Sequence, residues 1–493
     1  MTTDMDFSIP YAFAKEKGVV LSQPSPDRVE LKLRHDASAA TLAEVRRHLP
    51  MAPVITMLDD ATFEQMLAET YLNQQNAATG LSEDLGQDVD LSQLVQDMPR
   101  VEDLLEAEDD APIIRMINTV LTQALREGAS DIHLEIFEHR AVIRFRLDGE
   151  LRDVLEPHRA LHTSLVSRIK IMAQLDIAEK RLPQDGRIAL KLAGKPVDVR
   201  VSTLPTGHGE RVVLRLLDKS TGKLDLATLG MGKSTLQELN TLIAQPHGIL
   251  LVTGPTGSGK TTTLYAALSH IDATRMNIMT VEDPIEYDLD GIGQTQVNPR
   301  IDMSFAKALR AILRQDPDVI MIGEIRDLET AQIAVQASLT GHLVLATLHT
   351  NDAVSAVTRL IDMGVEPFLL ASSLLGVLAQ RLVRKLCPAC KQPLGAEATR
   401  DWEAEFPALR TEHVCTSTGC PQCDHTGYRG RTGIYELLII NDALRHLIHD
   451  GVSEQRMREH ALALGMQNLR ADGLRWVTAG MTSLEEVLRV SKD

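Results

Sequence analysis

Apolar residues recur at helical spacing near residue 111 of this 493-residue chain and alternate with polar residues directly afterwards. The first pattern predicts a helix over 111–131, because one face of a helix repeats about every 3.6 residues. The alternation over 132–147 predicts two strands with a short polar turn between them. A helix around 158–178 and two strands around Gly194 follow. We expect residues 111–217 to form one α+β domain with an antiparallel meander.

From residue 233 the pattern changes to short β-rich apolar runs separated by helical segments. The runs are Gly248–Gly254, Asn277–Asp283, Asp318–Glu324 and His342–His349. This alternation is typical of a parallel sheet covered by helices. Residues 436–493 are expected to be mostly helical. The Gly-containing polar segment 218–232 is a candidate hinge between the two regions.

The start of the chain reads as a small domain of mixed short elements, residues 1–80. An acidic linker, 81–110, is expected after it. Within residues 83–110 we count eleven Asp and Glu against one Arg, a net charge of -10. Such a composition is typical of a solvated connector, and an acidic docking strip is the alternative.

Length and charge limit the function classes. A chain of 493 residues with 44% hydrophobic and 24% charged residues is expected to contain several globular domains. The net charge of -17 argues against nucleic acid or an anionic membrane as a direct partner. The longest apolar run, Pro367–Ala379, falls short of the ~20 residues that a membrane helix needs. The N-terminus does not resemble a secretory signal, so we expect a cytoplasmic protein.

Glycines and hydroxyls gather where the first β-rich run ends. The segment Gly254–Thr261 matches the phosphate-binding pattern G-x-x-x-x-G-K-[ST] between a predicted strand and a predicted helix. Lys260 is expected to reach the β- and γ-phosphates, and Thr261 to ligate Mg²⁺. The alternative is an ordinary Gly-rich turn. The expected nucleotide-binding residues of this loop are Gly254, Pro255, Thr256, Gly257, Ser258, Gly259, Lys260, Thr261 and Thr262.

Carboxylates lie at or just after the ends of two of the other runs. Glu282, Asp283 and Glu286 lie just past one predicted strand, and Glu324 ends another. Ligands of a parallel sheet bind at this carboxyl edge. One acid there can hold Mg²⁺ through water, and another can orient or deprotonate the attacking water. Solvated strand ends are the alternative.

Two histidines bracket the last run. His342 and His349 are about 20 Å apart along a strand, so they cannot share a metal ion unaided. His349, at the carboxyl end, is the candidate for a contact near the γ-phosphate. A structural role is the alternative for both histidines.

Four arginines are candidates for phosphate contacts. Arg200 and Arg215 lie on predicted strands before the hinge, whereas Arg310 and Arg314 lie one helical turn apart after it. An arginine held rigidly can close onto a phosphate as an arginine finger does. The alternative is a salt bridge on the surface.

All five cysteines lie between Cys387 and Cys423. They form two C-x-x-C pairs, Cys387 with Cys390 and Cys420 with Cys423, while Cys415 is left over. Two such pairs can supply the four thiolates of a structural zinc site. A redox dithiol or unligated thiols are the alternatives. Because thiols are absent elsewhere, a disulfide framework is not expected.

These motifs together resemble one family, the secretion ATPases of bacterial type II secretion and type IV pilus systems. The resemblance spans about 111–493 and rests on the phosphate-binding loop and five further segments. They are "TVEDPIEY" (280–287), "IMIGEIRD" (320–327), "TGHLVLATLHTND" (340–352), "ASDIHLE" (129–135) and "RFRLDG" (144–149). The segment "YAFAKEKGVVL" (11–21) resembles the start of the type II secretion member.

The resemblance implies an α/β fold with a RecA-like P-loop ATPase domain, 233–493, after a PAS-like domain, 111–217. It also implies a small N-terminal domain and an inserted tetracysteine zinc subdomain, 387–423. The family forms hexameric rings with nucleotide between the two larger domains. The implied catalytic residues are Glu286 (water activation), Glu324 (Walker B), Lys260 and His349. Arg200, Arg215, Arg310 and Arg314 match the phosphate-sensing arginines.

The resemblance therefore predicts a Mg²⁺-dependent ATPase motor that powers type II secretion by driving pseudopilus assembly. It would reach an inner-membrane platform through residues 1–80, touching the membrane only through protein partners. A type IV pilus assembly ATPase is the nearest alternative. A nucleic-acid translocase and a small-molecule kinase are more distant ones.

Overall fold

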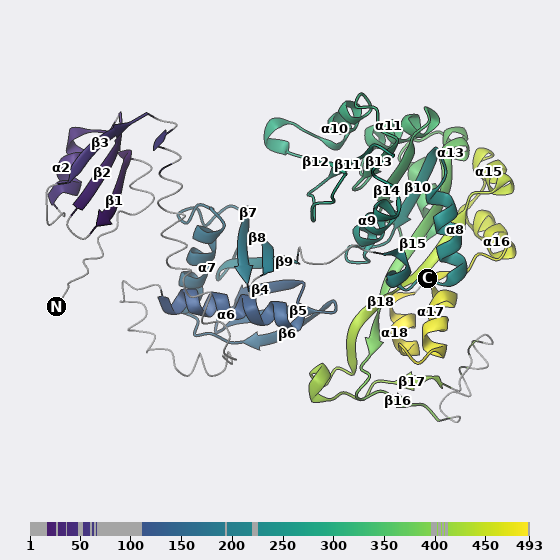
Figure 1. Cartoon of the computed structure of the whole chain (residues 1–493). Helices are drawn as coiled ribbons and strands as arrows, with labels where there is room; N and C mark the ends of the chain where they lie inside the picture. Colours follow the sequence, from purple (N-terminus) through teal and green to yellow (C-terminus); the bar gives the residue numbers. More distant parts are fainter. Residues whose placement is uncertain are drawn as a thin grey trace. The chain divides into compact units, whose positions relative to one another are not determined.

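The computed structural model describes residues 17–25, 28–35, 37–47, 53–59, 62, 63, 66, 111–192, 195–218, 225–395, 402, 406, 409 and 413–491. The chain forms two compact units, Met1–Gln93 and Leu94–Asp493 (Figure 1). The predicted acidic linker, 81–110, lies outside the described residues, as do residues 11–16.

The first unit contains a small three-stranded sheet. Strands β1 (Val19–Ser25) and β2 (Arg28–Arg34) pair antiparallel, and β3 (Val54–Leu58) pairs parallel to β2. Helix α2 (Ala39–Arg47) lies between β2 and β3 in the chain. Together they bury a core of Val19, Val20, Leu31, Leu33, Val45 and Phe63. Strand β3 is an edge strand that leaves Val54, Ile55 and Met57 exposed.

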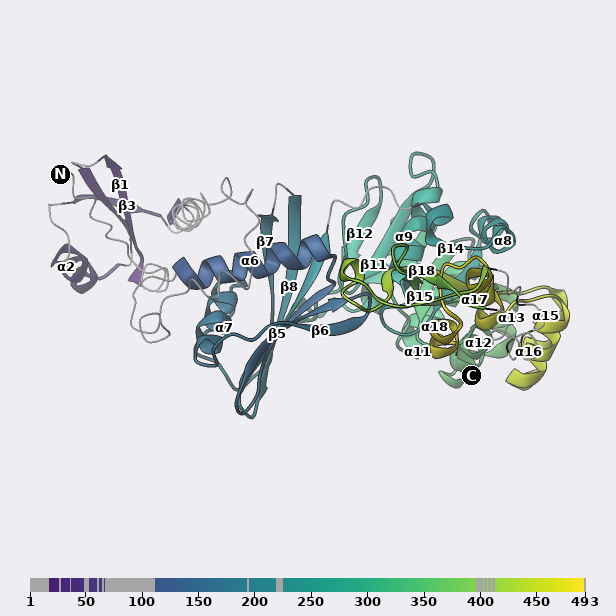
Figure 2. The same ribbon diagram turned by 90° about the horizontal axis from the view of Figure 1, so that it is seen from below.

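The described part of the second unit begins with a six-stranded antiparallel sheet and two helices, α6 (Ala111–Glu127) and α7 (Leu161–Met172) (Figure 2). The strand order is β6-β5-β4-β9-β8-β7. Their bounds are β4 (Asp131–Ile136), β5 (Ala141–Leu147), β6 (Glu150–Leu155), β7 (Gln184–Leu192), β8 (Lys195–Thr206) and β9 (Gly209–Asp218). The predicted meander is present as β4, β5 and β6.

Because successive side chains along a strand point to opposite sides, this sheet has an apolar face and a polar face. Ile132, Leu134, Val212 and Leu214 are buried on the face that meets α6 and α7. On the other face the ladder pairs Arg187 with Arg200, Arg200 with Arg215, and Arg215 with Asp131. The sheet therefore presents a row of arginines on its polar face.

A seven-stranded sheet, in the order β12-β11-β13-β14-β10-β15-β18, forms the centre of the remaining part. Its strands are β10 (Gly248–Thr253), β11 (Ile278–Glu282), β12 (Gly293–Gln296), β13 (Val319–Ile322), β14 (Leu343–Leu348), β15 (Leu374–Leu386) and β18 (Tyr428–Ile439). Six strands run parallel, and β18 pairs antiparallel to β15. The four β-rich runs of the sequence are β10, β11, β13 and β14, as predicted.

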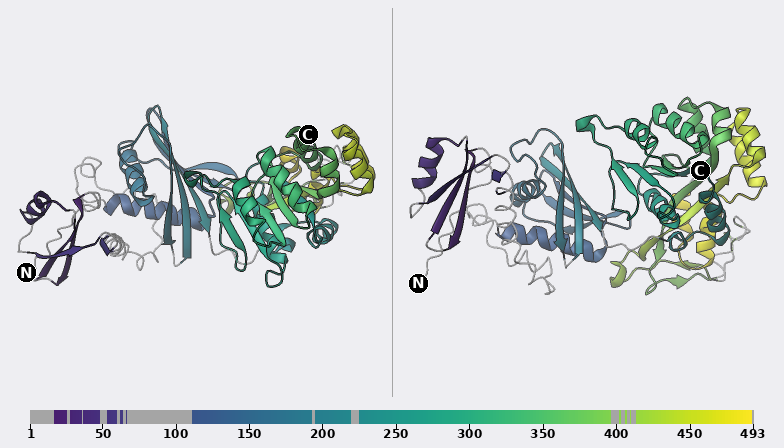
Figure 3. Two further views of the ribbon diagram at one scale, coloured as in Figure 1. Left: turned by 90° about the horizontal axis from the view of Figure 1, so that it is seen from above. Right: turned by 45° about the horizontal axis from the view of Figure 1, so that its top comes forward.

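Helices cover both faces of this sheet (Figure 3). Helices α8 (Lys233–Ile243) and α9 (Lys260–His270) bury Leu239 and Leu264 on one face. The other face meets α10 (Phe305–Ile312), α11 (Leu328–Leu339), α12 (Ala353–Asp362), α13 (Pro367–Ser373), α15 (Asp442–His449) and α16 (Glu454–Ala463). Within the part described, no helix has the length and apolar character needed to cross a membrane.

The region between β15 and β18 carries the cysteines. It includes the short strands β16 (Gln392–Pro393) and β17 (Cys415–Thr416), which pair antiparallel. Helices α17 (Leu469–Thr478) and α18 (Leu484–Val490) pack a separate small core against β15 and β18. The expectation of a mostly helical 436–493 is wrong for its first residues, which belong to β18. That strand is specified by its pairing with distant β15, which the local pattern does not reveal.

Candidate active site

The phosphate-binding loop joins β10 to α9 and is built on its glycines. Gly254, Gly257 and Gly259 have φ values of +148°, +79° and +87°, which favour glycine. A Cβ on Gly254 would lie 2.5 Å from the carbonyl oxygen of Gln380, and one on Gly259 would lie 2.8 Å from Nε2 of the same residue. The loop is thus shaped by close contact with β15. Lys260, Thr261 and Thr262 form the first turn of α9, whose N–H groups face an incoming phosphate without intrahelical partners.

Gln380 clamps this loop and was not found by sequence reasoning. Its side chain is buried, donates through Nε2 to the Ser258 carbonyl at 2.7 Å and accepts from Thr263 Oγ1 at 2.7 Å. One amide therefore holds both the loop and the first turns of α9. A glutamine inside an apolar strand run was the available signal.

Lys260 lies folded into the loop. Its Nζ donates to the carbonyls of Gly254 at 2.8 Å and Pro255 at 3.1 Å. Burial lowers its pKa to about 8, and the Glu324 carboxylate opposes that shift. The two carbonyls accept the hydrogen bonds of the Lys260 ammonium, and phosphate oxygens of a nucleotide could take the place of these carbonyls.

Glu324 and His349 lie beside Lys260. The Nδ1 of His349 is 3.5 Å from Lys260 Nζ, and its Nε2 is 3.6 Å from Glu324 Oε2. Burial, and then the Lys260 cation, lowers the pKa of His349 below its usual value. Because β13, β14 and β10 are adjacent and parallel, their carboxyl ends bring these three residues to one edge of the sheet.

Glu286 pairs with an arginine from the other sheet. Arg200, on β8, places Nη2 3.1 Å from Glu286 Oε2 and donates to the Ile285 carbonyl at 3.0 Å. Both side chains are partly buried. The turn after β11 is thereby joined to the α+β region that precedes it in the chain.

Arg326 connects two of the acidic segments and was not predicted. It forms an ion pair with Glu324, and its Nη1 lies 3.5 Å from Asp283 Oδ2. The arginine in "GEIRD" lies two residues after Glu324, so its proximity was readable from the sequence.

The other candidates have contacts elsewhere. Arg215 Nε donates to Asp131 at 2.9 Å. Arg310 Nη2 lies 2.6 Å from Glu329 Oε1, and Arg314 Nη1 donates to the Arg310 carbonyl at 2.8 Å. His342 Nδ1 is 2.8 Å from the Ala337 carbonyl. Glu282 is buried at the end of β11. Phosphate contacts by these three arginines stay predictions.

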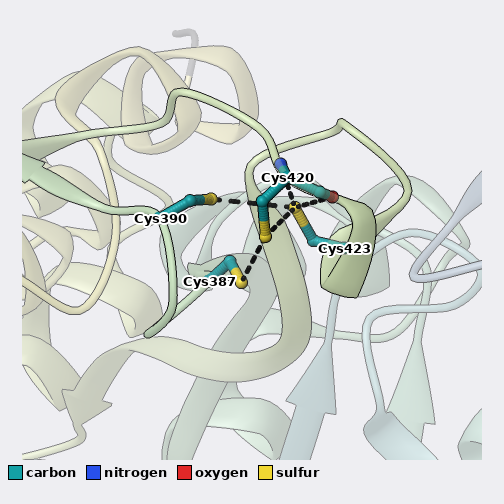
Figure 4. A group of neighbouring side chains, drawn as sticks. All are labelled: Cys387, Cys390, Cys420 and Cys423. Atoms are coloured by element: carbon teal, nitrogen blue, oxygen red, sulfur yellow. Dashed lines mark hydrogen bonds between the residues drawn. The ribbon is translucent and has the colours of Figure 1, made fainter.

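The four paired cysteines converge on one point (Figure 4). The Sγ atoms of Cys387 and Cys420 are 4.0 Å apart, and that of Cys423 lies 3.8 Å from those of both Cys390 and Cys420. A tetrahedral zinc ion with Zn–S bonds of about 2.3 Å separates its sulfurs by about 3.8 Å, so the cluster fits Zn²⁺. Although burial opposes it, hydrogen bonds from the Cys420 and Gly427 N–H groups lower the pKa of Cys423 to about 6. Those bonds favour the thiolate that a metal requires.

Known proteins place these features in a family. The family model described as "Type II/IV secretion system protein" matches residues 106–489, and a second model, for a domain of "GSPII protein E", matches residues 8–71. The chain belongs to the type II/IV secretion system protein family. Type II secretion system protein HxcR of Pseudomonas aeruginosa is 60% identical over 98% of this chain and 99% of its own. Type II secretion system ATPase E of Vibrio cholerae is 57% identical over 98% of this chain and 97% of its own.

Solved structures agree with this secretion ATPase assignment. The pilus retraction motor PilT with bound ADP is 28% identical, with a TM-score of 0.52, over 76% of this chain and 97% of its own. The ATPase DotB of Legionella pneumophila, at 20% identity and a TM-score of 0.58 over 76% of this chain and 95% of its own, shows the fold alone. The predicted family, fold class and Mg²⁺-dependent ATPase activity are confirmed, and type II secretion is favoured over the alternatives.

Nucleotide affinity of the secretion ATPase should depend on the charge of Lys260. Because the pKa of Lys260 is about 8 before phosphate binds, binding above that pH must take up a proton. The Kd of a non-hydrolysable ATP analogue is expected to rise roughly 10- to 30-fold between about pH 7.5 and about pH 9.5. Fluorescence titration across this range measures it.

The matched control is Lys260→Arg, whose guanidinium stays charged throughout the range. Its Kd, although weaker, should not change steeply with pH. An equal slope in both proteins would contradict the assignment of the titration to Lys260.

Zinc content should depend on the paired cysteines and not on Cys415, whose Sγ contacts the His413 carbonyl at 3.3 Å instead. Cys390→Ser is expected to lower bound zinc from one ion per chain to near zero and to lower the Tm, since one of four ligands is lost. Cys415→Ser should keep both. Inductively coupled plasma mass spectrometry and thermal unfolding test this. Equal zinc content in the two variants would contradict the four-cysteine site.

Proposed function

We propose that this secretion ATPase is a motor in which ATP hydrolysis at the carboxyl edge of the seven-stranded sheet drives movement of the preceding α+β region. The observation that carries the proposal is the pair between Arg200 and Glu286, which links the two regions at the site. A residue bound to the catalytic acid from another region couples chemistry to movement. The segment 218–232 is the hinge, with 111–217 and 233–493 as the moving parts.

The chain's residues have distinct roles in this proposal. Lys260 exchanges the Gly254 and Pro255 carbonyls for phosphate oxygens, and Thr261 contributes a hydroxyl to the metal. Glu324 fills the Walker B role. His349 lies near the γ-phosphate, and before nucleotide binds, burial and the Lys260 cation lower its pKa and so favour the neutral ring. The remaining residues of the loop, Gly254–Thr262, donate backbone hydrogen bonds, except Pro255, which has no N–H. ATP supplies the phosphoanhydride bond, and Mg²⁺ neutralises its charge when bound.

Arg200 and Glu286 act as a switch in this scheme. While Arg200 holds Glu286, the guanidinium contacts both carboxylate oxygens, at 3.1 Å and 3.4 Å, and so occupies the atoms that would accept a proton from water. A phosphate competes for the arginine and leaves Glu286 able to take a proton from water. Arg215, Arg310 and Arg314 would likewise exchange their present partners for phosphate oxygens. Such exchange makes closure of the α+β region depend on the nucleotide.

The site is proposed to work in a homo-hexameric ring in the cytoplasm, recruited peripherally to the inner membrane. Residues 1–80 would dock to a platform protein of a type II secretion system, with 81–110 as the linker. The match of residues 8–71 to the "GSPII protein E" domain and the exposed apolar edge of β3 support this docking. The ring would drive pseudopilus assembly through the platform. Nucleic acid is not a partner in this scheme, which agrees with the net charge of -17.

Loss of the switch should lower turnover strongly. Arg200→Gln is expected to reduce kcat by about 10²-fold or more, as removal of a transition-state cation does. Phosphate release should be measured with the full chain across a range of protein concentrations. The wild-type rate per chain should rise with concentration as rings assemble.

Arg187→Gln is the matched control, because Arg187 is paired with Arg200 across the sheet but forms its ion pair with Asp198. It should keep kcat within about 2-fold, the change typical of a surface position. Equal kcat in the Arg200 and Arg187 variants would contradict the role of Arg200. A rate strictly proportional to concentration would contradict the ring.

Docking should depend on the edge of the first sheet. Ile55 and Met57 are 42% and 55% exposed on β3. The double variant Ile55→Lys/Met57→Lys of the full chain is expected to lose capture of a type II platform protein from detergent-solubilised inner membranes, because edge strands recruit partners. Mass spectrometry identifies the captured protein.

The control is Arg47→Glu on the exposed end of α2. It changes charge in the same unit and should leave capture intact. Equal capture by wild type and the β3 variant would remove that strand from the docking surface, and recovery of pilus platform components would favour pilus assembly.

A further inference from the structure

Tyr265 is a fully buried residue of α9 for which the proposed chemistry has no use. It lies five residues after Lys260, on the helix that begins at the phosphate-binding loop. Its ring meets that of Tyr287 edge to face, with centroids 4.6 Å apart and an interplanar angle of 80°. This packing directs the hydroxyl towards the end of β11.

The hydroxyl joins two parts of the acidic segment. It donates a hydrogen bond to Oε2 of Glu282. On its other side it accepts the backbone N–H of Glu286 at 3.3 Å and Nε2 of Gln294 at 3.4 Å. A phenol can donate once and still accept, so these bonds are compatible.

Glu282 is fixed in turn by its second oxygen. Oε1 accepts from Thr280 Oγ1 at 2.6 Å and from Gln294 Nε2 at 3.0 Å. The carboxylate is therefore held in one orientation inside the protein and cannot move towards a nucleotide without breaking both bonds. Burial, and then the Glu282 carboxylate, raises the pKa of Tyr265 above its usual value, so its hydroxyl stays protonated.

We propose that Tyr265 is a positioning residue for Glu286, resting on the proposed role of Glu286 as the base. Its hydroxyl is the direct link between the helix that holds the phosphates and the backbone that carries the base. The distance between the bound γ-phosphate and the carboxylate is then set by the packing of α9 and not by the turn alone. Because a misplacement of about 1 Å in a reacting group can cost about 10²-fold in rate, such a link matters for turnover.

The variant that tests this is Tyr265→Phe, which keeps the ring and removes the oxygen. The kcat of the full chain is expected to fall about 10-fold, while the KM for ATP stays within about 2-fold, because the phosphate contacts are unchanged. A change in KM with kcat intact would overturn the proposal.

Tyr287→Phe is the matched control. Among the described residues the Tyr287 hydroxyl is buried with no hydrogen-bond partner, although its ring packs against Tyr265. It removes the same atom from the neighbouring ring and should leave kcat within about 2-fold. An equal fall in kcat in both variants would assign the effect to packing and overturn the proposal.

A double-mutant cycle with Glu286→Gln separates positioning from a purely structural role. If Tyr265 acts through Glu286, adding Tyr265→Phe to Glu286→Gln should cost less than about 2-fold in the single-turnover rate of radiolabelled ATP. A structural role would cost the same factor in both backgrounds, and that result would overturn the proposal.

The outcomes distinguish this inference from the proposed function. Full activity of Glu286→Gln would contradict the role of Glu286 as the base, and it would contradict the role of Tyr265 as well. A slow Glu286→Gln beside a fully active Tyr265→Phe would remove only the role of Tyr265. If Tyr265→Phe fails to fold, Glu282→Gln takes its place, since its amide oxygen accepts the Tyr265 hydroxyl more weakly than a carboxylate does, while its NH₂ group replaces the oxygen that accepts from Thr280 and Gln294. Glu282→Gln should lower kcat about 2- to 5-fold, and adding it to Glu286→Gln should not lower the single-turnover rate further. An unchanged kcat in Glu282→Gln would overturn the proposal.

Discussion

The parallel pairing of β13, β14, β10 and β15 is the constraint on which the rest of the site depends. The registers Ile322 with Ala346 and Thr253 with Leu348 make the carboxyl ends of neighbouring strands meet at one edge. Every strand of this set is nearly or wholly buried at that point, so a slip by one residue would move each side chain to the opposite face and disrupt its packing against the helices there. The cost of such a slip keeps the loop, the acid and the histidine together.

Charge at that edge is balanced within a few ångströms. Lys260 loses water on burial and regains two carbonyl oxygens from its own loop. His349 lies between this cation and Glu324, and Arg326 joins the same acid to Asp283. A site whose cations already have oxygen partners can accept phosphate oxygens by exchange, which costs less than desolvating free charges.

The α+β region contacts the ATPase region at two separate places. Arg200 reaches Glu286 near the nucleotide loop, whereas Arg152 on β6 lies 2.9 Å from Asp424, the residue after Cys423. The Gly430 N–H also donates to Asp148 at 2.7 Å. A four-thiolate metal site makes its loop rigid without a core of its own. The segment that follows Cys423 thus contacts β6 and the turn between β5 and β6.

The sequence by itself determined the elements whose signal is local. The glycine pattern before Lys260, the apolar runs of β10, β11, β13 and β14, and the two C-x-x-C pairs each follow from neighbouring residues, because backbone freedom, strand burial and ligand spacing act at short range. Only the tertiary structure decided which distant groups meet. Gln380 beneath the loop, Arg200 on Glu286 and the addition of β18 all depend on strand pairing across long separations, and Arg215, with the same sequence signal as Arg200, pairs with Asp131 instead. A side chain's type predicts what it can bind, whereas its partner is fixed only when the chain has packed.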